Sequence, residues 1–254
     1  MYANYHTHTF RCNHATGVEE EYILTAIEGG IKIMGFSDHA PAILYDGYKL
    51  SWRVQPEDAE DYFETLKNLR EKYKDKIKIY IGFEMEYYPE YFEKMYSYVK
   101  NLGAEYLILG QHFYDELGGI PHSAMAGHSD EHLINYTNSV IAGMKTGKFL
   151  YVAHPDMLNH SGDKMIYERE ARRLCEASKK FDVPLEINLL GVFDGRHYPN
   201  EAFLKIAGEV GCKMLYGFDA HSPDRAYDKA SLEKAERLAQ KYNINIIDEV
   251  DIHL

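Results

Sequence analysis

Short apolar runs with β-sheet character alternate along this chain with longer segments whose apolar residues recur at helical spacing. Eight of the short runs are predicted to be strands: Tyr2–His6, Ile31–Ser37, Ile77–Phe83, Tyr106–Gly110, Phe149–Ala153, Pro184–Asn188, Lys213–Gly217 and, the weakest, Asn245–Ile247. Because strands and helices that alternate form βα units, the pattern predicts a mainly parallel sheet.

The segments between these strands carry helix start and stop signals. Thr16 and Glu19 have the spacing of a capping box, and Ser129 with Gly147 can open and close a later helix. The longest irregular stretch, Ala40–Gln55, is predicted to form a loop over a functional site. The predicted helices are Val18–Gly30, three that open at Pro56, Pro89 and Ser129, and then Met165–Phe181, Pro199–Val210 and Pro223–Tyr242.

The number of βα units bears on the class of sheet. Seven or eight units in one chain favour an α/β barrel over an open sheet. No GxGxxG turn follows the first strand and no P-loop is present, so a nucleotide-type open sheet is disfavoured. The 254 residues, 45% hydrophobic and 27% charged, suit a single barrel domain over residues 1–254.

The net charge of the chain limits the classes of binding partner that we expect. Lys and Arg number 28 and Asp and Glu number 40, so the formal charge is 28 − 40 = −12. An acidic chain without a dense basic cluster disfavours nucleic acid as a partner. If the substrate is an anion, metal ions or a few local cations must attract it.

The expected compartment is the cytoplasm. The cysteines Cys12, Cys175 and Cys212 are widely spaced and form no CxxC pair, which argues against a disulfide framework or a zinc ribbon. The first residues do not resemble a signal peptide, and no apolar run approaches the ~18 residues that would span a bilayer. We therefore expect no membrane partner, while the oligomeric state stays open.

Metal-ligand residue types stand at the C-terminal ends of most predicted strands. In chain order these ends carry His6 and His8, His39, Glu84, His112, His154, and Asp219 with His221. In a parallel α/β barrel these ends meet at one face, where active sites are built. Residues two apart on a strand point the same way, so His6 and His8 can share one ion.

The residue types at these ends suit particular ions. Imidazole and carboxylate ligands together suit Zn, Mn or Fe, and Glu84 can bridge two ions ~3.5–4 Å apart. One HxH pair alone is weak evidence, and a lone histidine after a strand is more often structural. Coincidence would have to place such residues at six strand ends, so the sequence predicts a metal site.

Candidates for substrate contacts are fewer. Arg196 follows the sixth strand at the same face and is the leading candidate for a phosphate clamp, since guanidinium binds phosphate through two parallel hydrogen bonds. A surface arginine in a loop is the alternative. His197 and His160 are further candidates, and Arg11 and Arg53 are weaker ones. A pocket wall is predicted from Tyr45, Tyr48, Trp52, Tyr87, Tyr88 and Tyr114.

In the order and combination of these motifs the chain resembles the polymerase and histidinol phosphatase (PHP) family over nearly its whole length. The matching pieces are His6-Thr7-His8-Thr9, His14, Ser37-Asp38-His39, Gly82-Phe83-Glu84, Gly110-Gln111-His112-Phe113, Ala153-His154-Pro155-Asp156 and Phe218-Asp219-Ala220-His221. The Gly-Gln-His-Phe piece and Glu186-Ile187-Asn188 are most similar to the stand-alone histidinol-phosphatase branch.

The resemblance implies a distorted (β/α)7 barrel with two or three divalent metal ions at the C-terminal ends of its strands. The implied ligands are His6, His8, Glu84 and Asp219 for the first ion, Glu84, His112 and His154 for the second, and His14, His39 and His221 for the third. Which of Zn, Mn and Fe are native stays open.

The resemblance also implies a reaction, the hydrolysis of a small phosphomonoester by metal-activated hydroxide, with L-histidinol phosphate as the expected substrate. Arg196 would neutralise phosphoryl charge, and either Asp219 or a neighbouring histidine would orient water or protonate the leaving group. The alternatives are another phosphoesterase, such as a phosphotyrosine phosphatase or a nuclease, and a non-enzymatic metal-binding regulatory protein.

Overall fold

Every described strand runs parallel to its neighbours, in two sheets. The computed structural model describes residues 1–43, 50–114 and 122–254. The first sheet has the order β1 (Ala3–Asn4), β2 (Ile33–His39), β3 (Lys78–Met85) and β4 (Tyr106–Leu109). The second has the order β5 (Leu185–Asn188), β6 (Lys213–Gly217) and β7 (Asn245–Ile246). The predicted parallel α/β fold is therefore confirmed.

Isolated parallel bridges connect the two sheets. Val152 pairs with Leu109, the last residue of β4, and with Leu185, the first residue of β5. Thr7, beyond β1, pairs with Ala220, beyond β6. The sheet therefore curls round. The strand predicted at Phe149–Ala153 is present only as these bridges, and β1 is shorter than predicted, so the count of seven barrel strands stays a prediction.

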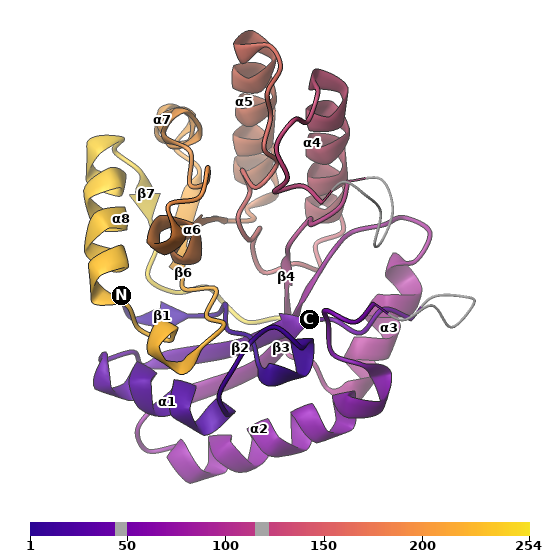
Figure 1. The fold of residues 1–254 in the computed structure, drawn as a ribbon, viewed down its shortest axis with the longest axis vertical. Coiled ribbons are helices and arrows are strands. Elements are labelled where there is room, and N and C mark those ends of the chain that lie inside the picture. Colours follow the sequence, from indigo (N-terminus) through magenta and orange to yellow (C-terminus); the bar gives the residue numbers. More distant parts are fainter. Residues whose placement is uncertain (44–49, 115–121) are drawn as a thin grey trace.

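The helices lie around the outside of the strands (Figure 1). They are α1 (Glu19–Glu28), α2 (Ala59–Tyr73), α3 (Phe92–Leu102), α4 (Asp130–Lys145), α5 (Lys164–Phe181), α6 (Leu189–Asp194), α7 (Glu201–Val210) and α8 (Lys229–Lys241). The short 3-10 turns are η1 (Phe10–Cys12), η2 (Pro56–Asp58) and η3 (Pro223–Arg225). None of the helices in the described part of the chain is long and apolar enough to cross a membrane.

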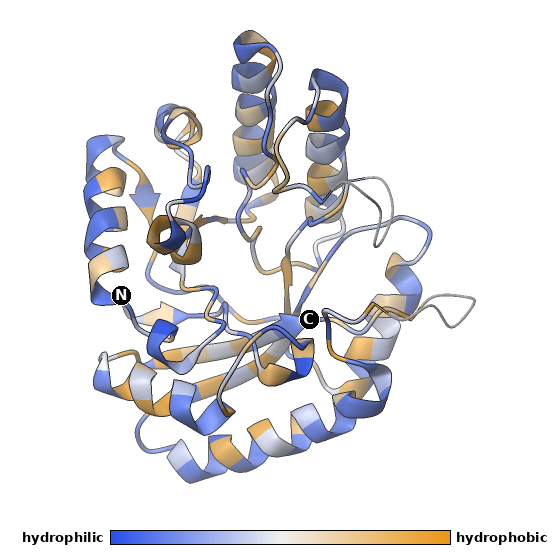
Figure 2. Ribbon diagram, viewed as in Figure 1, coloured by the Kyte–Doolittle hydropathy of each residue, from blue (hydrophilic) through white to orange (hydrophobic). Residues whose placement is uncertain are grey.

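Each long helix has both apolar and polar positions (Figure 2). In α3 the buried residues Phe92, Met95, Tyr96 and Val99 follow the i, i+3, i+4, i+7 spacing, which places them on one face. This apolar face packs into the core that the helices share with the strands. Burial of such faces against the curled sheet is what holds the strand ends in place.

Several predicted helix ends are confirmed and one is wrong. Ser129 accepts a hydrogen bond from the His132 N–H at the start of α4, as predicted. The capping box expected at Thr16 is not formed, because the Thr16 N–H donates to the backbone carbonyl of His221 instead. The start of α1 is capped by Glu21, whose carboxylate accepts from the Val18 N–H.

Other helix predictions need small corrections. Pro56 and Pro223 open the single turns η2 and η3, and the helices α2 and α8 begin a few residues later. The helix predicted to open at Pro89 begins at Phe92. The sequence analysis missed α6, which begins directly after β5 with the Asn188 side chain accepting from the Gly191 N–H.

A second buried cluster, rich in tyrosine, is formed mainly by residues in and beside the strands. Its buried members are Ala3, Tyr5, Ile33, Tyr106, Ile108, Leu150, Tyr151, Ala153 and Leu215. Ile247, Val250 and Ile252 of the C-terminal segment pack against this cluster. The Tyr5 hydroxyl accepts from the Val250 N–H (3.4 Å) and donates to its carbonyl (3.5 Å). The C-terminal segment thus covers this cluster.

Val250→Asp should destabilise the protein without affecting metal binding. The substitution would replace the apolar contact that Val250 makes with the tyrosine-rich cluster by a carboxylate, which is costly to bury. The free energy of unfolding should fall by about 2 kcal/mol. For a chain of this size that lowers Tm by roughly 5 °C in a thermal scan. Asp251→Asn, at an exposed neighbour, is the control. An unchanged Tm for Val250→Asp would show that the segment does not seal the cluster.

Candidate metal centre

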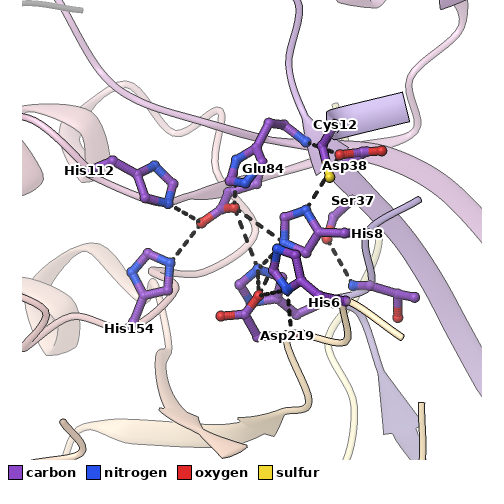
Figure 3. Close-up of polar contacts among 12 residues, drawn as sticks. His6, His8, Cys12, Ser37, Asp38, Glu84, His112, His154 and Asp219 are labelled. Carbon is purple, nitrogen blue, oxygen red and sulfur yellow. Dashed lines mark hydrogen bonds and ion pairs between the residues drawn. The ribbon is translucent and has the colours of Figure 1, made fainter. Parts of the chain in front are cut away.

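The residues predicted from the strand ends meet in one buried cluster (Figure 3). His39 ends β2 and pairs in register with Glu84 on the neighbouring strand β3. The other members follow β1, β4, the Val152 bridge and β6. Side chains that are almost fully buried are those of His6, His8, His39, Glu84, His112, His154 and Asp219. His221 is half-buried and His14 is exposed.

Glu84 lies at the centre of the cluster, with one carboxylate oxygen toward each side (Figure 3). Its Oε1 is 2.8 Å from His154 Nε2 and 3.5 Å from His112 Nε2. Its Oε2 faces three further imidazole nitrogens, at 3.1 Å (His39 Nδ1), 3.5 Å (His6 Nε2) and 3.6 Å (His8 Nε2). A carboxylate divided in this way can bridge two metal ions.

Asp219 completes the group on the Oε2 side of Glu84. Its Oδ1 is 3.4 Å from His6 Nε2 and 3.1 Å from His8 Nε2. The two imidazole nitrogens are themselves 3.2 Å apart. Two imidazole nitrogens from neighbouring positions and a carboxylate oxygen from the far end of the chain therefore converge on one point, as they must to hold one ion.

A third group joins His14, His39 and His221. His14 Nδ1 donates to the Cys12 carbonyl (2.8 Å), and His221 Nδ1 donates to the Asp219 carbonyl (2.9 Å). In a neutral imidazole whose Nδ1 carries the proton, Nε2 carries a lone pair. The two Nε2 atoms lie 3.1 Å apart. Two lone pairs at this distance repel unless a proton or a metal ion lies between them.

Three buried carboxylates hold the imidazoles from behind. His6 Nδ1 bonds to Glu186 (2.8 Å), and His112 Nδ1 bonds to Glu86 (2.9 Å). His8 Nδ1 faces Asp38 at a longer 3.4 Å. Hydrogen bonds of this kind fix the tautomer, so that Nε2 is free to bind a metal ion, and they raise its basicity. The sequence analysis gave these three carboxylates no role.

The electrostatics of the cluster favour positive charge. Burial would lower the pKa of His6, but the carboxylates of Asp219, Glu186 and Glu84 outweigh it and raise this pKa to about 10. Burial would raise the pKa of Glu84, yet His112, His6 and His39 hold it well below its usual value. Burial and the neighbouring His8 lower the pKa of His221 to about 3. The Glu84 carboxylate therefore stays ionised and attracts either protons or metal ions.

Buried polar atoms without partners test whether the residues fit a metal. Among the described residues, Glu84 Oε2, His39 Nδ1 and His154 Nδ1 are buried and lack a hydrogen-bond partner. Unpaired buried polar atoms are costly and uncommon. Two of them, on Glu84 and His39, face each other inside the cluster. The donor set therefore fits divalent ions that bind imidazole and carboxylate.

Two members of the cluster have an unusual backbone conformation. His154 (φ 30°) and Asp219 (φ 50°) lie in the left-handed region, which L side chains rarely adopt. Each is held by its surroundings, because the His154 N–H donates to Glu186 (2.9 Å) and Asp219 Oδ2 accepts from Asn188 (3.1 Å). Strained conformations persist where such contacts impose them, often at functional sites.

A cavity of about 550 Å³ opens onto the cluster. Besides the ligand-type residues its wall is formed by Trp52, Phe113, His122, Ala124, Met157, Leu190, Arg196 and Tyr198. Among the described residues the wall is thus largely aromatic and apolar, with Arg196 as its one permanent cation, the composition typical of small-molecule sites.

Comparison with known proteins decides the family. Residues 4–189 match the PHP domain. This chain belongs to the PHP domain family. It is 23% identical over 227 residues, with 86% of the chain and 85% of the relative covered, to a protein of Deinococcus radiodurans named probable histidinol-phosphatase. It is also 25% identical over 249 residues, covering 95% and 84%, to a probable phosphatase of Shewanella halifaxensis.

A solved structure of another PHP relative shares the fold. The histidinol phosphate phosphatase of Lactococcus lactis, solved in complex with zinc, L-histidinol and phosphate, superimposes with a TM-score of 0.76. The match covers 98% of each chain at 18% sequence identity. The family resemblance predicted from the motifs is therefore confirmed, and the curled parallel sheet is the fold of this relative.

Three of the four described residues in the predicted pocket wall of this PHP domain are corrected by the structure. Trp52 lines the cavity as predicted. Tyr87 packs against Phe92, the Tyr88 hydroxyl donates to the Phe113 carbonyl, and Tyr114 stacks on His132. These three tyrosines contribute to the core and not to the wall. Tyr45 and Tyr48, with the rest of residues 44–49 in the predicted loop, lie outside the described residues.

The predicted substrate contacts separate into two groups. Arg196 lines the cavity, where its guanidinium donates to Asp194 (Nε, 2.9 Å) and to the Tyr198 hydroxyl (2.6 Å). His160 instead bonds to Asp130 (2.7 Å), and His197 bonds to the Met157 carbonyl (2.6 Å). Neither imidazole forms part of the cavity wall, so their contact with substrate stays a prediction without structural support.

The weaker arginine candidates are held in ion pairs. Arg11 is buried and pairs with Glu19 and Asp61. Arg53 is buried and pairs with Glu86 (2.8 Å). Neither lines the cavity. His122 does line it, although the sequence analysis did not single it out; only its position near His112 in space, 5.6 Å between ring centroids, reveals it.

Removal of divalent ions should destabilise this PHP domain. Without ions the buried carboxylates of Glu84 and Asp219 rely on protonated imidazoles as counter-charges, whereas an ion present at 100 to 1,000 times its Kd adds about 3–4 kcal/mol to the free energy of unfolding. Chelation should therefore lower Tm by roughly 10 °C. Adding Zn or Mn back should restore it in a calorimetric scan. The same Tm with and without chelator would contradict a metal centre.

Proposed function

We propose that this PHP protein is a metal-dependent phosphomonoesterase whose natural substrate is L-histidinol phosphate. The observation that carries the proposal is that the two carboxylate oxygens of Glu84 face different histidines. One oxygen faces His112 and His154, and the other faces His6, His8 and His39. Family membership and the name of the Deinococcus relative support it. The relative of known structure that binds L-histidinol and phosphate supports the choice of substrate.

The proposed ligand sets keep the assignment that the family resemblance implies, and the contacts within the cluster support it. They are His6, His8, Glu84 and Asp219 for one ion, Glu84, His112 and His154 for a second, and His14, His39 and His221 for a third. Divalent ions held there would act as Lewis acids and lower the pKa of water toward neutrality. With this arrangement we propose that the curled sheet is a distorted (β/α)7 barrel with the metal centre at the C-terminal ends of its strands.

The remaining roles belong to side chains of the chain itself. Arg196, a permanent cation in the cavity wall, would bind the phosphoryl oxygens, and its bonds to Asp194 and Tyr198 hold its guanidinium in place. Asp219, fixed by Asn188, would orient the attacking water. The aromatic and apolar wall would exclude bulk water from the reacting group.

Arg196→Met should weaken substrate binding more than turnover. Loss of a guanidinium that contacts the phosphate would raise KM for a phosphomonoester by roughly 10- to 100-fold, about 1.4–2.7 kcal/mol. Arg225→Met is the control, because Arg225 is a nearby arginine that contacts Phe193, Asp224 and Asp228 and does not line the cavity. Equal KM values for wild type and Arg196→Met would show that Arg196 does not contact the phosphate.

Steady-state phosphate release tests the proposed function. The enzyme is chelated, restored with Mn or Zn, and assayed on L-histidinol phosphate, p-nitrophenyl phosphate and phosphotyrosine. A preference for L-histidinol phosphate of ~100-fold or more, about 2.7 kcal/mol of transition-state stabilisation, is the expected result. Slow and similar rates on all three would be consistent with a general metal-dependent phosphatase. They would contradict the proposal that L-histidinol phosphate is the natural substrate.

A less specific phosphatase is the second candidate. The Shewanella relative carries only the name probable phosphatase, and it is matched over almost the whole of this chain. The same metal groups would serve other phosphoesters, including phosphotyrosine. Activity on single-stranded DNA without activity on monoesters would instead support a nuclease, and bound metal without any hydrolysis would support a regulatory protein.

A further inference from the structure

A buried ion pair, Arg53 with Glu86, lies directly behind the cavity wall. Both side chains are about 1% exposed, and neither lines the cavity. Arg53 precedes η2, in the segment that connects β2 to α2, and Glu86 follows the last residue of β3. Glu86 fixes the imidazole of His112, but neither its ion pair with Arg53 nor the contact of Arg53 with Trp52 has a place in the proposed chemistry, so the burial of this pair beside the metal centre calls for an explanation.

The pair contacts two different walls of the site. Glu86 Oε1 accepts hydrogen bonds from Arg53 (2.8 Å) and from His112 Nδ1 (2.9 Å). On the other side, the Arg53 guanidinium carbon lies 4.0 Å from the ring centroid of Trp52. Arg53 also donates to the Ala40 carbonyl (2.8 Å), which ties it to the end of β2. One ion pair therefore connects a proposed metal ligand to an aromatic wall residue.

The pair is poorly optimised as a device for stability alone. Removing two charges from water is expensive, and buried pairs are often no more stabilising than apolar residues of the same volume. Arg53 Nε and Glu86 Oε2 are both buried without a hydrogen-bond partner among the described residues. The contacts that the pair does make are directional, and they are aimed at His112 and Trp52.

We propose that Arg53 and Glu86 are positioning residues that couple Trp52 to His112. With divalent ions bound by the proposed ligands, Glu86 would hold the imidazole of His112 in its ligating orientation, and Arg53, fixed by Glu86, would hold the Trp52 ring at the cavity. The pocket wall then takes its final position only when this side of the metal centre is filled. The inference rests on the proposed function for its metal ligands and deepens it.

The chain itself supplies the reporter for a test. Trp52 is its single tryptophan, so tryptophan fluorescence reports on this wall alone. The measurement is the quenching of Trp52 by acrylamide, with and without Zn, which does not itself quench by paramagnetism. In the wild type, Zn should reduce the quenching constant because the ring becomes fixed. Zn affinity is measured in parallel by titration.

The decisive variant is Arg53→Met/Glu86→Gln, which removes both charges at similar volume and leaves the ring contacts of Trp52 with His39 and His112. We expect normal folding by circular dichroism, a Zn affinity weaker by about 10- to 100-fold, and no Zn-dependent protection of Trp52 even at saturating Zn. Wild-type affinity and wild-type protection in this variant would reduce the pair to a structural role and overturn the proposal.

Two further variants complete the design. Arg70→Met/Glu105→Gln removes a half-buried ion pair away from the cavity and should keep both Zn responses. Arg53→Lys keeps a positive charge beside Glu86 but removes the planar guanidinium that contacts the Trp52 ring. It should therefore keep Zn affinity and lose protection, which tests the proposal if the double variant fails to fold; retained protection would overturn it.

The outcome is separable from that of the proposed function. If no phosphomonoester is hydrolysed but Zn protects Trp52 in the wild type and not in the double variant, the coupling stands and the function fails. If L-histidinol phosphate is hydrolysed but the two proteins respond to Zn alike, the function stands and the coupling fails.

Discussion

Glu84→Gln should abolish phosphatase turnover while the fold stays intact. The amide keeps the volume of the side chain, but it offers one weakly coordinating oxygen in place of a carboxylate whose two oxygens face different histidines. We expect kcat/KM to fall by at least ~10³-fold, about 4 kcal/mol. Elemental analysis should show the loss of about one ion or more per chain.

The control for this substitution is Glu170→Gln. Glu170 is also about 1% exposed, but it lies in α5, where it pairs with Arg169 and Arg173. Its loss should lower stability and leave metal content and turnover near wild type. Normal turnover in Glu84→Gln, with normal metal content, would mean that this carboxylate does not bridge and that the proposed centre is wrong.

Gly110→Ala should disable the centre through sterics alone. A Cβ at Gly110, which follows β4, would occupy the space of the Glu84 carboxylate and Cγ. The end of a flexible side chain can move aside, so the protein should still fold, but the carboxylate would leave its position between the histidines. We expect a loss of ~10²-fold or more in kcat/KM, about 2.7 kcal/mol, and reduced metal content.

Gly147→Ala is the matched control for this space argument. Nothing lies within 4 Å of a Cβ at Gly147, although its φ of +64° makes alanine strained. The control should therefore cost roughly 1 kcal/mol of stability and leave kinetics unchanged. If Gly110→Ala retains full activity and metal, the packing of Gly110 against Glu84 does not position the carboxylate.

The cluster of candidate ligands could be predicted because it follows from periodicity. Parallel strands that alternate with helices place their C-terminal ends together, so a histidine or carboxylate at each end must converge. His14 is different, because it lies in the loop after η1 and only the family motif identified it. Its meeting with His221 depends on backbone contacts such as Thr16 N–H to the His221 carbonyl.

The carboxylates behind the imidazoles could have been found in part. Glu86 stands two residues after Glu84, the same spacing that drew attention to His6 and His8, and residues two apart share one side of a strand. Glu186 and Asn188 show the same spacing on β5. Their partners could not be predicted, because a sequence does not give the lateral register between neighbouring strands.

The predicted aromatic wall failed for a physical reason. Tyr88 and Tyr114 are large amphipathic side chains next to functional motifs, but helices α3 and α4 cover them and their rings fill the core. Trp52 reaches the cavity because Arg53 fills the space behind it. Adjacency in sequence to a ligand therefore does not decide which aromatic residues face the site.

Anomalous X-ray diffraction from crystals grown with Zn or Mn tests the central claim most directly. Data collected on either side of the absorption edge of the metal locate each ion without reference to activity. The account predicts two peaks on opposite sides of the Glu84 carboxylate, ~3.5–4 Å apart, with a third beside His14 and His221. A site with no peak within bonding distance of Glu84, in crystals that hold the metal elsewhere, would contradict it.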